Sequence, residues 1–281
     1  MDSNATGNYE IFLMNASGVV EKQLTSNVAY DSWWARISPN RQKILFYRDP
    51  AGVHDTNPRQ NSLWEMNADG SDQTELLPAG AYGWGLQGHA EWSPDGVKMV
   101  MIGGPWGNPQ IFVTDATGAN PVQVTNRGGT NIDPSWAPSG NEIVFVGCPQ
   151  AQCLPAQQEV YTLAPVSVFG TLTRITNDSY ADYDPSFSPN GSQIAWLRQV
   201  SSSDWSIEIS TIGGGGYQAL IDDGNVNSAP EWSSDGSLIY FHRLVVGTYA
   251  AFGIWSISPT GADLDQVLAP KGTVGYEYPG T

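Results

Sequence analysis

The sequence has few charged residues, few cysteines and no long apolar stretch. Charged residues make up 14% of the 281 residues, against roughly 25% in an average globular protein. Only 12 are Lys or Arg whereas 28 are Asp or Glu, which gives a formal net charge of −16. This charge argues against binding of nucleic acid or of anionic membrane surfaces. No apolar run reaches the roughly 18 residues that a membrane-spanning helix requires, so we expect no membrane insertion.

The two cysteines, Cys148 and Cys153, stand close together in the sequence. Without a Cys/His cluster they make a poor zinc site, and we expect a local disulfide, which indicates an oxidising compartment. Two reduced thiols are the alternative. The first residues form neither a basic segment nor an apolar core, so they do not predict a signal peptide. We therefore expect the mature form of a periplasmic or secreted protein.

Turn-forming and aromatic residues are abundant. The chain has 31 Gly and 19 Pro, and aromatic residues make up 11% of it, with 11 Trp among them. Such a composition supplies enough apolar surface for a folded core and excludes a disordered chain.

A short motif recurs along the chain at intervals of 44 to 55 residues. It reads Glu-Trp-Ser-Pro-Asp-Gly at 91–96, and related copies stand at 36–41, 135–140, 186–191 and 231–236. Each copy precedes a compact apolar run, such as Ile-Val-Phe-Val at 143–146. A turn motif before so short a run indicates a strand that is buried on both faces. We expect the aromatic residues of the four clear copies to be buried between neighbouring sheets: Trp92, Trp136, Phe187 and Trp232.

A second hairpin motif alternates with the first, and its copies begin at Glu10, Leu63, Gln110, Glu159, Ser206 and Gly253. Two hairpins make a four-stranded sheet, and radial repetition of such sheets is a β-propeller. We therefore predict an all-β chain that folds as one domain, a six-bladed propeller of four-stranded antiparallel blades. The blades are expected at 31–77, 89–125, 132–176, 183–221 and 228–268, with a sixth built from the hairpin at 9–27 and a closing tail at 271–281. The sixth blade is expected to lack one strand, with the tail at its innermost position.

The two motifs together resemble the TolB-type (WD40-like) propeller repeats over roughly residues 9–270. The hallmark of that family is Trp/Phe-Ser-Pro-Asp-Gly before an apolar strand, followed by an Ile-Tyr-like strand that ends in Asp-Gly. The resemblance implies the propeller fold. The family includes periplasmic scaffold proteins, accessory domains of peptidases and some polysaccharide lyases, so the resemblance does not select one activity.

One face of the predicted propeller is the better candidate for function. We label the strands of a blade A to D from the centre outward. The A–B and C–D turns, such as 94–96 and 68–70, are short and uniform. The loops of the opposite face are long and irregular, and binding residues concentrate on variable loops over a rigid scaffold. We therefore place function on the face of the B–C and D–A loops.

All three histidines of the chain map to this face: His54, His89 and His242. They could act as metal ligands or as a general base, or they could be independent surface residues. His89 occupies the same repeat position as Asp133 and Asp184, so these three side chains are expected around the mouth of the central channel. Such a ring could hold Ca²⁺ or another divalent cation. The alternative is that each Asp caps backbone N–H groups where its strand begins.

Arg48, Arg198 and Arg243 occupy one equivalent position, and a guanidinium there suits a carboxylate or sulfate ligand. The alternative pairs them with nearby carboxylates, namely Asp31, Asp182 and Asp222 respectively. Aromatic residues of the same loops suit sugar rings or a protein partner, and the candidates are Trp34, Tyr82, Trp84, Trp106 and Trp205.

The sequence lacks the Gly-X-Ser-X-Gly, His-Glu-X-X-His and phosphate-loop motifs. We therefore expect a monomeric, non-catalytic, extracytoplasmic binding propeller that recognises a glycan or a protein partner through its B–C/D–A face. One alternative is a polysaccharide lyase acting on a uronate-containing glycan, with His89, His54, Tyr82 and Arg48 as its catalytic candidates. Another is a TolB-like scaffold for envelope assembly.

Overall fold

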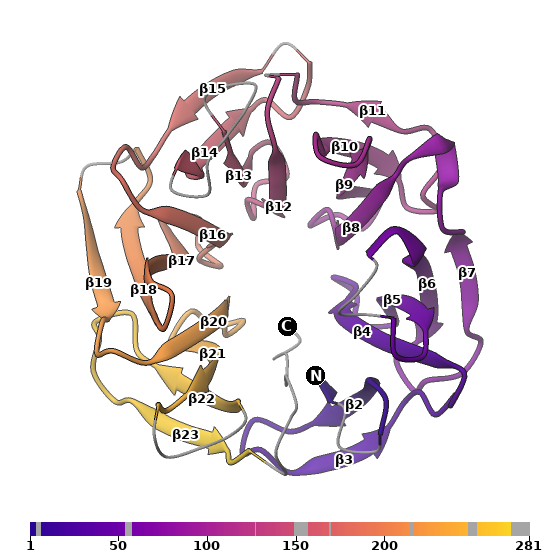
Figure 1. Cartoon of the computed structure of the whole chain (residues 1–281), viewed down its shortest axis with the longest axis horizontal. Coiled ribbons are helices and arrows are strands. Elements are labelled where there is room, and N and C mark those ends of the chain that lie inside the picture. Colours follow the sequence, from indigo (N-terminus) through magenta and orange to yellow (C-terminus); the bar gives the residue numbers. More distant parts are fainter. Residues whose placement is uncertain are drawn as a thin grey trace.

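A computed structural model describes residues 1–3, 7–53, 58–126, 128–148, 157–168, 170–213, 216–246 and 252–270. Antiparallel sheets stand side by side around a central axis (Figure 1). Besides the strands, the described residues include two short 3-10 helices, η1 (Pro58–Gln60) and η2 (Ala81–Gly83). The prediction of an all-β chain is confirmed.

Each complete sheet is a meander in which consecutive strands are neighbours, as the alternating hairpin motifs predicted. The first is β4 (Tyr30–Ile37), β5 (Lys43–Pro50), β6 (Ser62–Asn67) and β7 (Thr74–Leu77). The second is β8 (Leu86–Trp92), β9 (Lys98–Gly104), β10 (Gln110–Asp115) and β11 (Val122–Gln123). The third is β12 (Asn131–Trp136), β13 (Ile143–Gly147), β14 (Glu159–Ala164) and β15 (Thr171–Arg174).

Two further meanders are joined into one eight-stranded sheet by a single parallel pair, Trp205 with Val226. One comprises β16 (Ala181–Phe187), β17 (Gln193–Ser201), β18 (Asp204–Thr211) and β19 (Tyr217–Ile221). The other comprises β20 (Val226–Trp232), β21 (Ile239–Leu244), β22 (Gly253–Ile257) and β23 (Asp265–Leu268).

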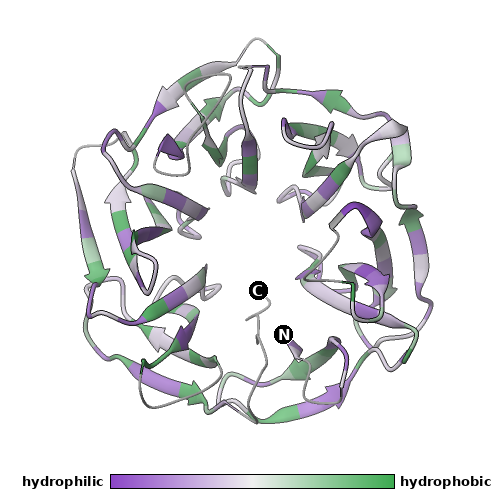
Figure 2. Ribbon diagram, viewed as in Figure 1, coloured by the Kyte–Doolittle hydropathy of each residue, from purple (hydrophilic) through white to green (hydrophobic). Residues whose placement is uncertain are grey.

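The core lies within and between these sheets, and Figure 2 shows the hydrophobic residues concentrated on the strands. The apolar run 143–146 is fully buried. The four aromatic residues of the Ser-Pro motif are buried as predicted, with exposed fractions between 6% and 8%: Trp92, Trp136, Phe187 and Trp232.

The innermost strands β4, β8, β12, β16 and β20 share a local irregularity. Each shows a shift in its register with the next strand, at the repeat position that the sequence placed at the channel mouth. A non-glycine residue there adopts a φ between 45° and 55°, which is uncommon because the Cβ atom is crowded in that conformation. Such a bulge re-aims a side chain. The five residues are Trp34, His89, Asp133, Asp184 and Ala229.

The remaining sheet has three strands, β1 (Asp2–Ser3), β2 (Glu10–Met14) and β3 (Val20–Gln23). The hairpin of β2 and β3 is where we predicted it. The sequence did not predict β1, which lies beside β2 on the side toward the axis. Residues 271–281, which we expected in this sheet, lie outside the described residues.

Cys148 is fully buried and forms a disulfide bond. The other cysteine of the chain, Cys153, lies outside the described residues.

Candidate functional site

Two rings of side chains from the innermost strands meet at the axis. We call Trp34, His89, Asp133, Asp184 and Ala229 the mouth ring. The residue two positions further along each strand belongs to the inner ring, which is Arg36, Glu91, Ser135, Ser186 and Glu231. All ten line one cavity of about 30 Å³. Because a water molecule needs roughly 10–15 Å³ of such volume, the cavity has room for about two water-sized groups.

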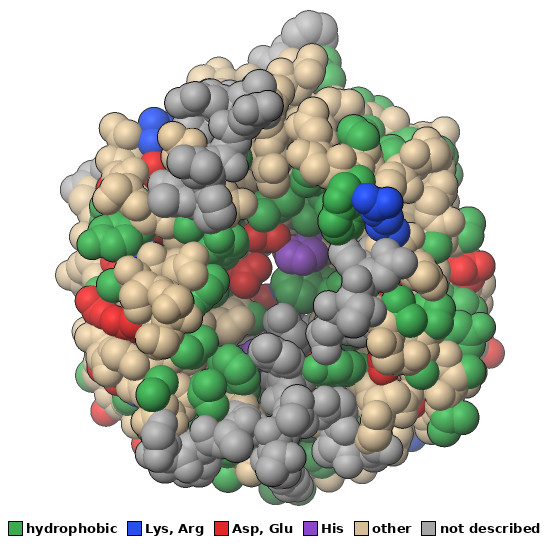
Figure 3. Space-filling view, in the orientation of Figure 1, with side chains coloured by type: hydrophobic (Ala, Val, Ile, Leu, Met, Phe, Trp, Pro, Cys, Tyr) green, Lys and Arg blue, Asp and Glu red, His purple; other side chains and the backbone are tan. Residues whose placement is uncertain are grey.

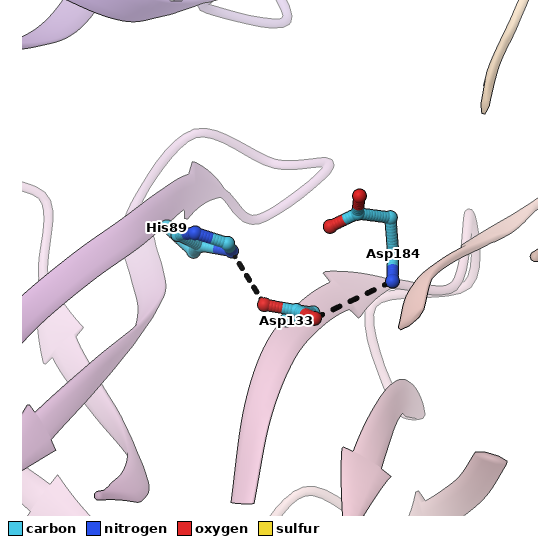
Figure 4. Close-up of side chains that lie close together, drawn as sticks. All are labelled: His89, Asp133 and Asp184. Atoms are coloured by element: carbon cyan, nitrogen blue, oxygen red, sulfur yellow. Dashed lines mark hydrogen bonds and ion pairs between the residues drawn. The ribbon is translucent and has the colours of Figure 1, made fainter. Parts of the chain in front are cut away.

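Three neighbouring members of the mouth ring form a polar cluster (Figure 4). His89 Nδ1 lies 2.8 Å from Asp133 Oδ1, and the other oxygen of Asp133 accepts the Asp184 N–H at 3.4 Å. The potential ligand atoms of His89, Asp133 and Asp184 all lie within 4.8 Å of one another. The Trp34 ring stacks on the His89 imidazole with centroids 4.1 Å apart, which fixes the orientation of the imidazole.

Burial and like charges shift the proton equilibria of this cluster. Burial raises the pKa of Asp184 to about 7, and the neighbouring Asp133 carboxylate adds to the rise. Burial lowers the pKa of His89, but the charge and hydrogen bond of Asp133 outweigh it, so the pKa lies above the usual 6.5. Both shifts show that the cluster favours additional positive charge.

The inner ring contains an ion pair and a buried acid. Arg36 pairs with Glu231, and its guanidinium also lies over the Trp34 ring, 4.5 Å from the centroid. Glu91 Oε1 accepts the Trp136 N–H at 3.0 Å, so one strand's side chain caps the next strand's backbone. Burial raises the pKa of Glu91 to about 7, although the Arg36 charge opposes the rise.

The donor set of the polar cluster fits a divalent cation. An imidazole nitrogen and two carboxylates converge on one small cavity. Ca²⁺ prefers oxygen ligands alone, whereas imidazole suits transition metals, so His89 favours the latter. The alternative role of Asp133 as a backbone cap is also observed, since its carboxylate accepts the Asp184 N–H.

The three arginines at equivalent positions are buried, with exposed fractions of 4–5%. Arg198 Nε lies 2.9 Å from Asp182, as the pairing alternative predicted, and Arg198 Nη2 lies 2.8 Å from Asp178. Burial raises the pKa of Asp182 to about 6 against the opposing hydrogen bond and charge of Arg198.

The other two arginines have partners different from the predicted ones. Arg48 donates to Gln73 at 2.8 Å, instead of to Asp31, and its guanidinium lies 4.4 Å from the centroid of the Trp64 ring. Arg243 pairs with Asp223 and Asn227, instead of with Asp222. Their burial favours a structural role over contact with an external ligand.

The predicted aromatic residues divide into two groups. Trp84 packs against Phe112 with centroids 4.5 Å apart, and Trp205 against Tyr183 at 5.4 Å, so both belong largely to the packing of the sheets. Tyr82 and Trp106 are exposed by 51% and 50%.

Figure 3 shows the face onto which the axis opens, with the histidine and acidic side chains inside a central depression. Arg59 belongs to η1 in the loop between β5 and β6, and its guanidinium lies 4.6 Å from the centroid of the Trp106 ring. Sequence reasoning did not single out Arg59.

The residues proposed for a lyase do not assemble around His89. Neither Tyr82 nor Arg48 lines the cavity beside it, and the Tyr82 hydroxyl donates instead to the Gly118 carbonyl at 3.0 Å. His54 lies outside the described residues. His242 is fully buried, so its interpretation as a surface residue was wrong.

Sequence reasoning also missed members of the two rings. Arg36, Glu91 and Glu231 each stand at the start of a Ser-Pro motif copy, so an alignment of the repeats could have found them. Trp34 was predicted as a ligand-binding aromatic, and the same alignment would have placed it in the mouth ring.

Among the described residues, no helix is long and apolar enough to span a membrane. The family model of the TolB beta propeller domain matches residues 53–198, which is more than half of the chain.

An uncharacterized protein from Agrobacterium fabrum is 27% identical over 164 residues, covering 54% of this chain and 53% of its own. A protein TolB homolog from Chlorobium luteolum is 26% identical over 106 residues, covering 37% of this chain and 22% of its own. The chain thus spans about half or less of the length of these curated relatives.

Among solved structures, TolB from Acinetobacter baumannii matches with a TM-score of 0.71 at 19% identity, over 90% of this chain and 58% of its own. An oligogalacturonate lyase in complex with manganese matches with a TM-score of 0.61 at 13% identity, over 95% of this chain and 72% of its own. At such identities these likenesses show the fold alone.

Proposed function

Because the chain belongs to the TolB β-propeller family, we propose that it is a monomeric, non-catalytic binding propeller of an extracytoplasmic compartment, which recognises a protein partner through the face of the channel mouth. In this proposal the sheets form a ring of six blades, and the three-stranded sheet β1–β3 is part of the sixth.

The observation that carries this proposal is a pair of exposed aromatic residues in the loops that we assign to that face, Tyr82 in a D–A loop and Trp106 in a B–C loop. Tyr82 and Trp106 expose half of their surface, and Arg59 stacks on Trp106. Tyr, Trp and Arg are the residue types that contribute most to the binding energy of protein interfaces. Because the guanidinium covers one face of the Trp106 ring, less of that ring is open to a stacked sugar than in a bare aromatic platform.

The geometry of the channel supports a non-catalytic role. A lyase requires a base beside the substrate carbon that loses its proton and a cationic group beside the carboxylate attached to that carbon. Arg48 is buried against Gln73 and Trp64, apart from the cavity that holds His89. The cavity itself, at about 30 Å³, is too small for a sugar ring.

The test compares the wild-type chain with the double variant Tyr82→Ala, Trp106→Ala. The binding partner is captured from envelope extract by cross-linking, identified by mass spectrometry and titrated in purified form. We expect the double variant to bind it at least about tenfold more weakly. The matched control is Val97→Ala, which changes a residue that is 57% exposed in an A–B turn of the opposite face and should leave affinity unchanged.

Three results would contradict the proposal. Equal affinity of the wild type and the double variant for the partner would exclude this face as the binding surface. Binding of the wild type to a glycan array, lost in the double variant, would replace the protein partner with a glycan. An unsaturated, ultraviolet-absorbing product formed from a uronic-acid polymer, and absent with His89→Ala, would show a lyase.

We propose in addition that the mouth ring binds a divalent transition metal through His89, Asp133 and Asp184. The supporting observation is the convergence of their ligand atoms within 4.8 Å. Calorimetric titration with Mn²⁺, Zn²⁺ and Ca²⁺ should show tighter binding of a transition metal than of Ca²⁺, and Asp184→Asn should weaken it at least about tenfold. The matched control is Asp95→Asn in an exposed turn of the opposite face. Equal binding by the wild type and Asp184→Asn would refute the site.

A further inference from the structure

A second cavity, of about 690 Å³, lies on the other side of the inner ring from the channel mouth. Arg36, Glu91 and Glu231 of the inner ring line both cavities and therefore separate them. Residues of the A–B turns line the far end of the larger cavity, so it belongs to the face opposite the mouth. Its volume is typical of small-molecule sites, which span roughly 300–1,000 Å³. We call this cavity the lower chamber.

The wall of the lower chamber is mainly apolar. Leu13 and Met14 of β2 and Ile37 of β4 line it. Leu13 and Ile37 expose 41% and 36% of their surface. Four innermost strands each add an aromatic side chain to the wall: Trp92, Trp136, Phe187 and Trp232. Because apolar surface gains free energy in proportion to the area that is removed from water, the chamber favours an apolar occupant.

A cation without a partner stands at the rim of this chamber. Arg41 belongs to the A–B turn between β4 and β5, is exposed, and lines the chamber. Within the described ranges, the Arg41 guanidinium has no hydrogen-bond or ion-pair partner, whereas Arg36 in the same lining pairs with Glu231. A guanidinium that is free in this way can bind a carboxylate or sulfate through two parallel hydrogen bonds.

The backbone of Arg41 sets this turn apart from the other four A–B turns. Its φ is 58°, in the left-handed region. The equivalent residue of the other turns is a glycine with φ between 69° and 72°, at Gly96, Gly140, Gly191 and Gly236. All five residues donate their N–H to the carbonyl three residues earlier, so the turn is the same and only the side chain differs. Because a Cβ atom is crowded in this conformation, Arg41 strains a turn in which glycine fits without strain.

We propose that the lower chamber binds a single-chain amphiphile with an anionic head group, such as a fatty acid. Arg41 binds the carboxylate at the rim, and the hydrocarbon chain lies along the apolar wall. The reverse orientation is disfavoured, because it places the anion beside Glu91 and Glu231 of the inner ring. The site is independent of the proposed partner and metal, since the inner ring separates it from the channel mouth.

The first test is calorimetric titration of the full-length chain with octanoate, decanoate and dodecanoate, below the concentrations at which they form micelles. We expect the affinity to rise about fourfold for each added methylene group, because the chain is transferred from water to an apolar wall. The dodecyltrimethylammonium ion, which has the opposite charge, should bind at least about tenfold more weakly than dodecanoate. Absence of dodecanoate binding, or an affinity independent of chain length or of head-group charge, would overturn the proposal.

The variant Arg41→Gly separates ligand binding from folding. It should weaken dodecanoate binding at least about tenfold by removing the cation, yet its melting temperature should equal or exceed that of the wild type, because glycine relieves the strain. Arg41→Lys keeps the charge and should retain most of the affinity. The matched control Lys98→Gln removes another exposed cation beside an A–B turn and should bind dodecanoate like the wild type. Equal affinity of Arg41→Gly and the wild type, or an equal loss in Lys98→Gln, would refute the assignment of Arg41.

A substitution in the wall locates the hydrocarbon chain. Ile37→Ser places a hydroxyl in the apolar wall and should weaken dodecanoate binding by about tenfold. The matched control is Val97→Ser, which changes an exposed valine in the next A–B turn, outside the chamber lining. Its affinity for dodecanoate should equal that of the wild type. If Ile37→Ser also binds like the wild type, the chain does not lie in the lower chamber and the proposal fails.

Discussion

The buried histidine His242 should make the protein lose stability between pH 7 and pH 5. Its side chain is fully buried in β21. Burial lowers its pKa to about 3, and the positive charge of the chain's terminal ammonium contributes. In the unfolded chain the pKa of a histidine is close to 6.5. Below pH 6.5 the unfolded state therefore binds a proton that the folded state does not, and stability falls as the pH falls.

The size of the loss follows from these two pKa values. The full difference, from 6.5 to about 3, corresponds to roughly 5 kcal/mol once the pH is below both values. At pH 5 the unfolded histidine is almost fully protonated while the folded one is still neutral. The loss from pH 7 to pH 5 is then about 2 kcal/mol.

Chemical denaturation at the two pH values measures the effect, provided that other titrating groups are cancelled. The pKa of Glu91 is raised in the folded state, so its protonation stabilises the folded protein as the pH falls. In the wild type this gain masks part of the loss caused by His242. The comparison is therefore between the wild type and His242→Leu, which removes only the histidine. The wild type should lose about 2 kcal/mol more than the variant between pH 7 and pH 5.

Phe241→Leu is the matched control for that comparison. It alters the neighbouring residue of the same strand, which is also fully buried but does not titrate. Its loss of stability should be the same at pH 7 and pH 5. If the wild type and His242→Leu lose equal stability over this range, the buried histidine is protonated in the folded state and the reasoning fails.

Three further substitutions test the packing and the buried polar contacts by chemical denaturation. Phe187→Ala should lower the free energy of unfolding by about 3–5 kcal/mol, because it empties a site between sheets, and a melt like that of the wild type would refute the predicted anchor. Asp182→Ala should cost about 3–5 kcal/mol by leaving Arg198 without its fully buried partner, and a loss below about 1 kcal/mol would show that Asp178 alone compensates. Asp2→Ala should cost about 1–3 kcal/mol, since the Trp34 N–H loses its acceptor at 2.6 Å. The control Asp2→Asn retains an oxygen that can accept this hydrogen bond, so it should cost less. Equal losses for the two variants would contradict the role of Asp2 as this acceptor.

The repeat motif made most of the fold predictable. The alternation of two hairpin motifs predicted the meanders, and the Ser-Pro motif predicted four buried aromatic residues that the structure confirms. These features depend on local turns and on short apolar runs, both of which are visible in sequence. The strand β1 was not predictable in this way, because Asp2 and Ser3 carry no apolar pattern and pair with β2 only through tertiary contact.

The candidate site was predictable in position but only partly in chemistry. Repeat spacing placed His89, Asp133 and Asp184 together, and the structure brings their ligand atoms within 4.8 Å. The same spacing grouped Arg48 with its equivalents as ligand-binding groups, yet these arginines are buried. Spacing identifies equivalent positions in the repeat. Whether the side chain faces the axis or the interior of a sheet depends on the pleat and on the bulge.

In the mouth ring, the backbone conformation comes from the repeated fold, whereas the chemistry comes from the individual side chains. A non-glycine residue with positive φ costs about 1–3 kcal/mol and often marks a functional site. Here the conformation also occurs at Ala229, whose methyl group can neither ligate a metal nor transfer a proton. The bulge is therefore a property of the innermost strand of each four-stranded meander, and the strain by itself does not indicate function. The functional signal is the identity of the residues placed there, since three adjacent positions carry an imidazole and two carboxylates whose potential ligand atoms converge within 4.8 Å.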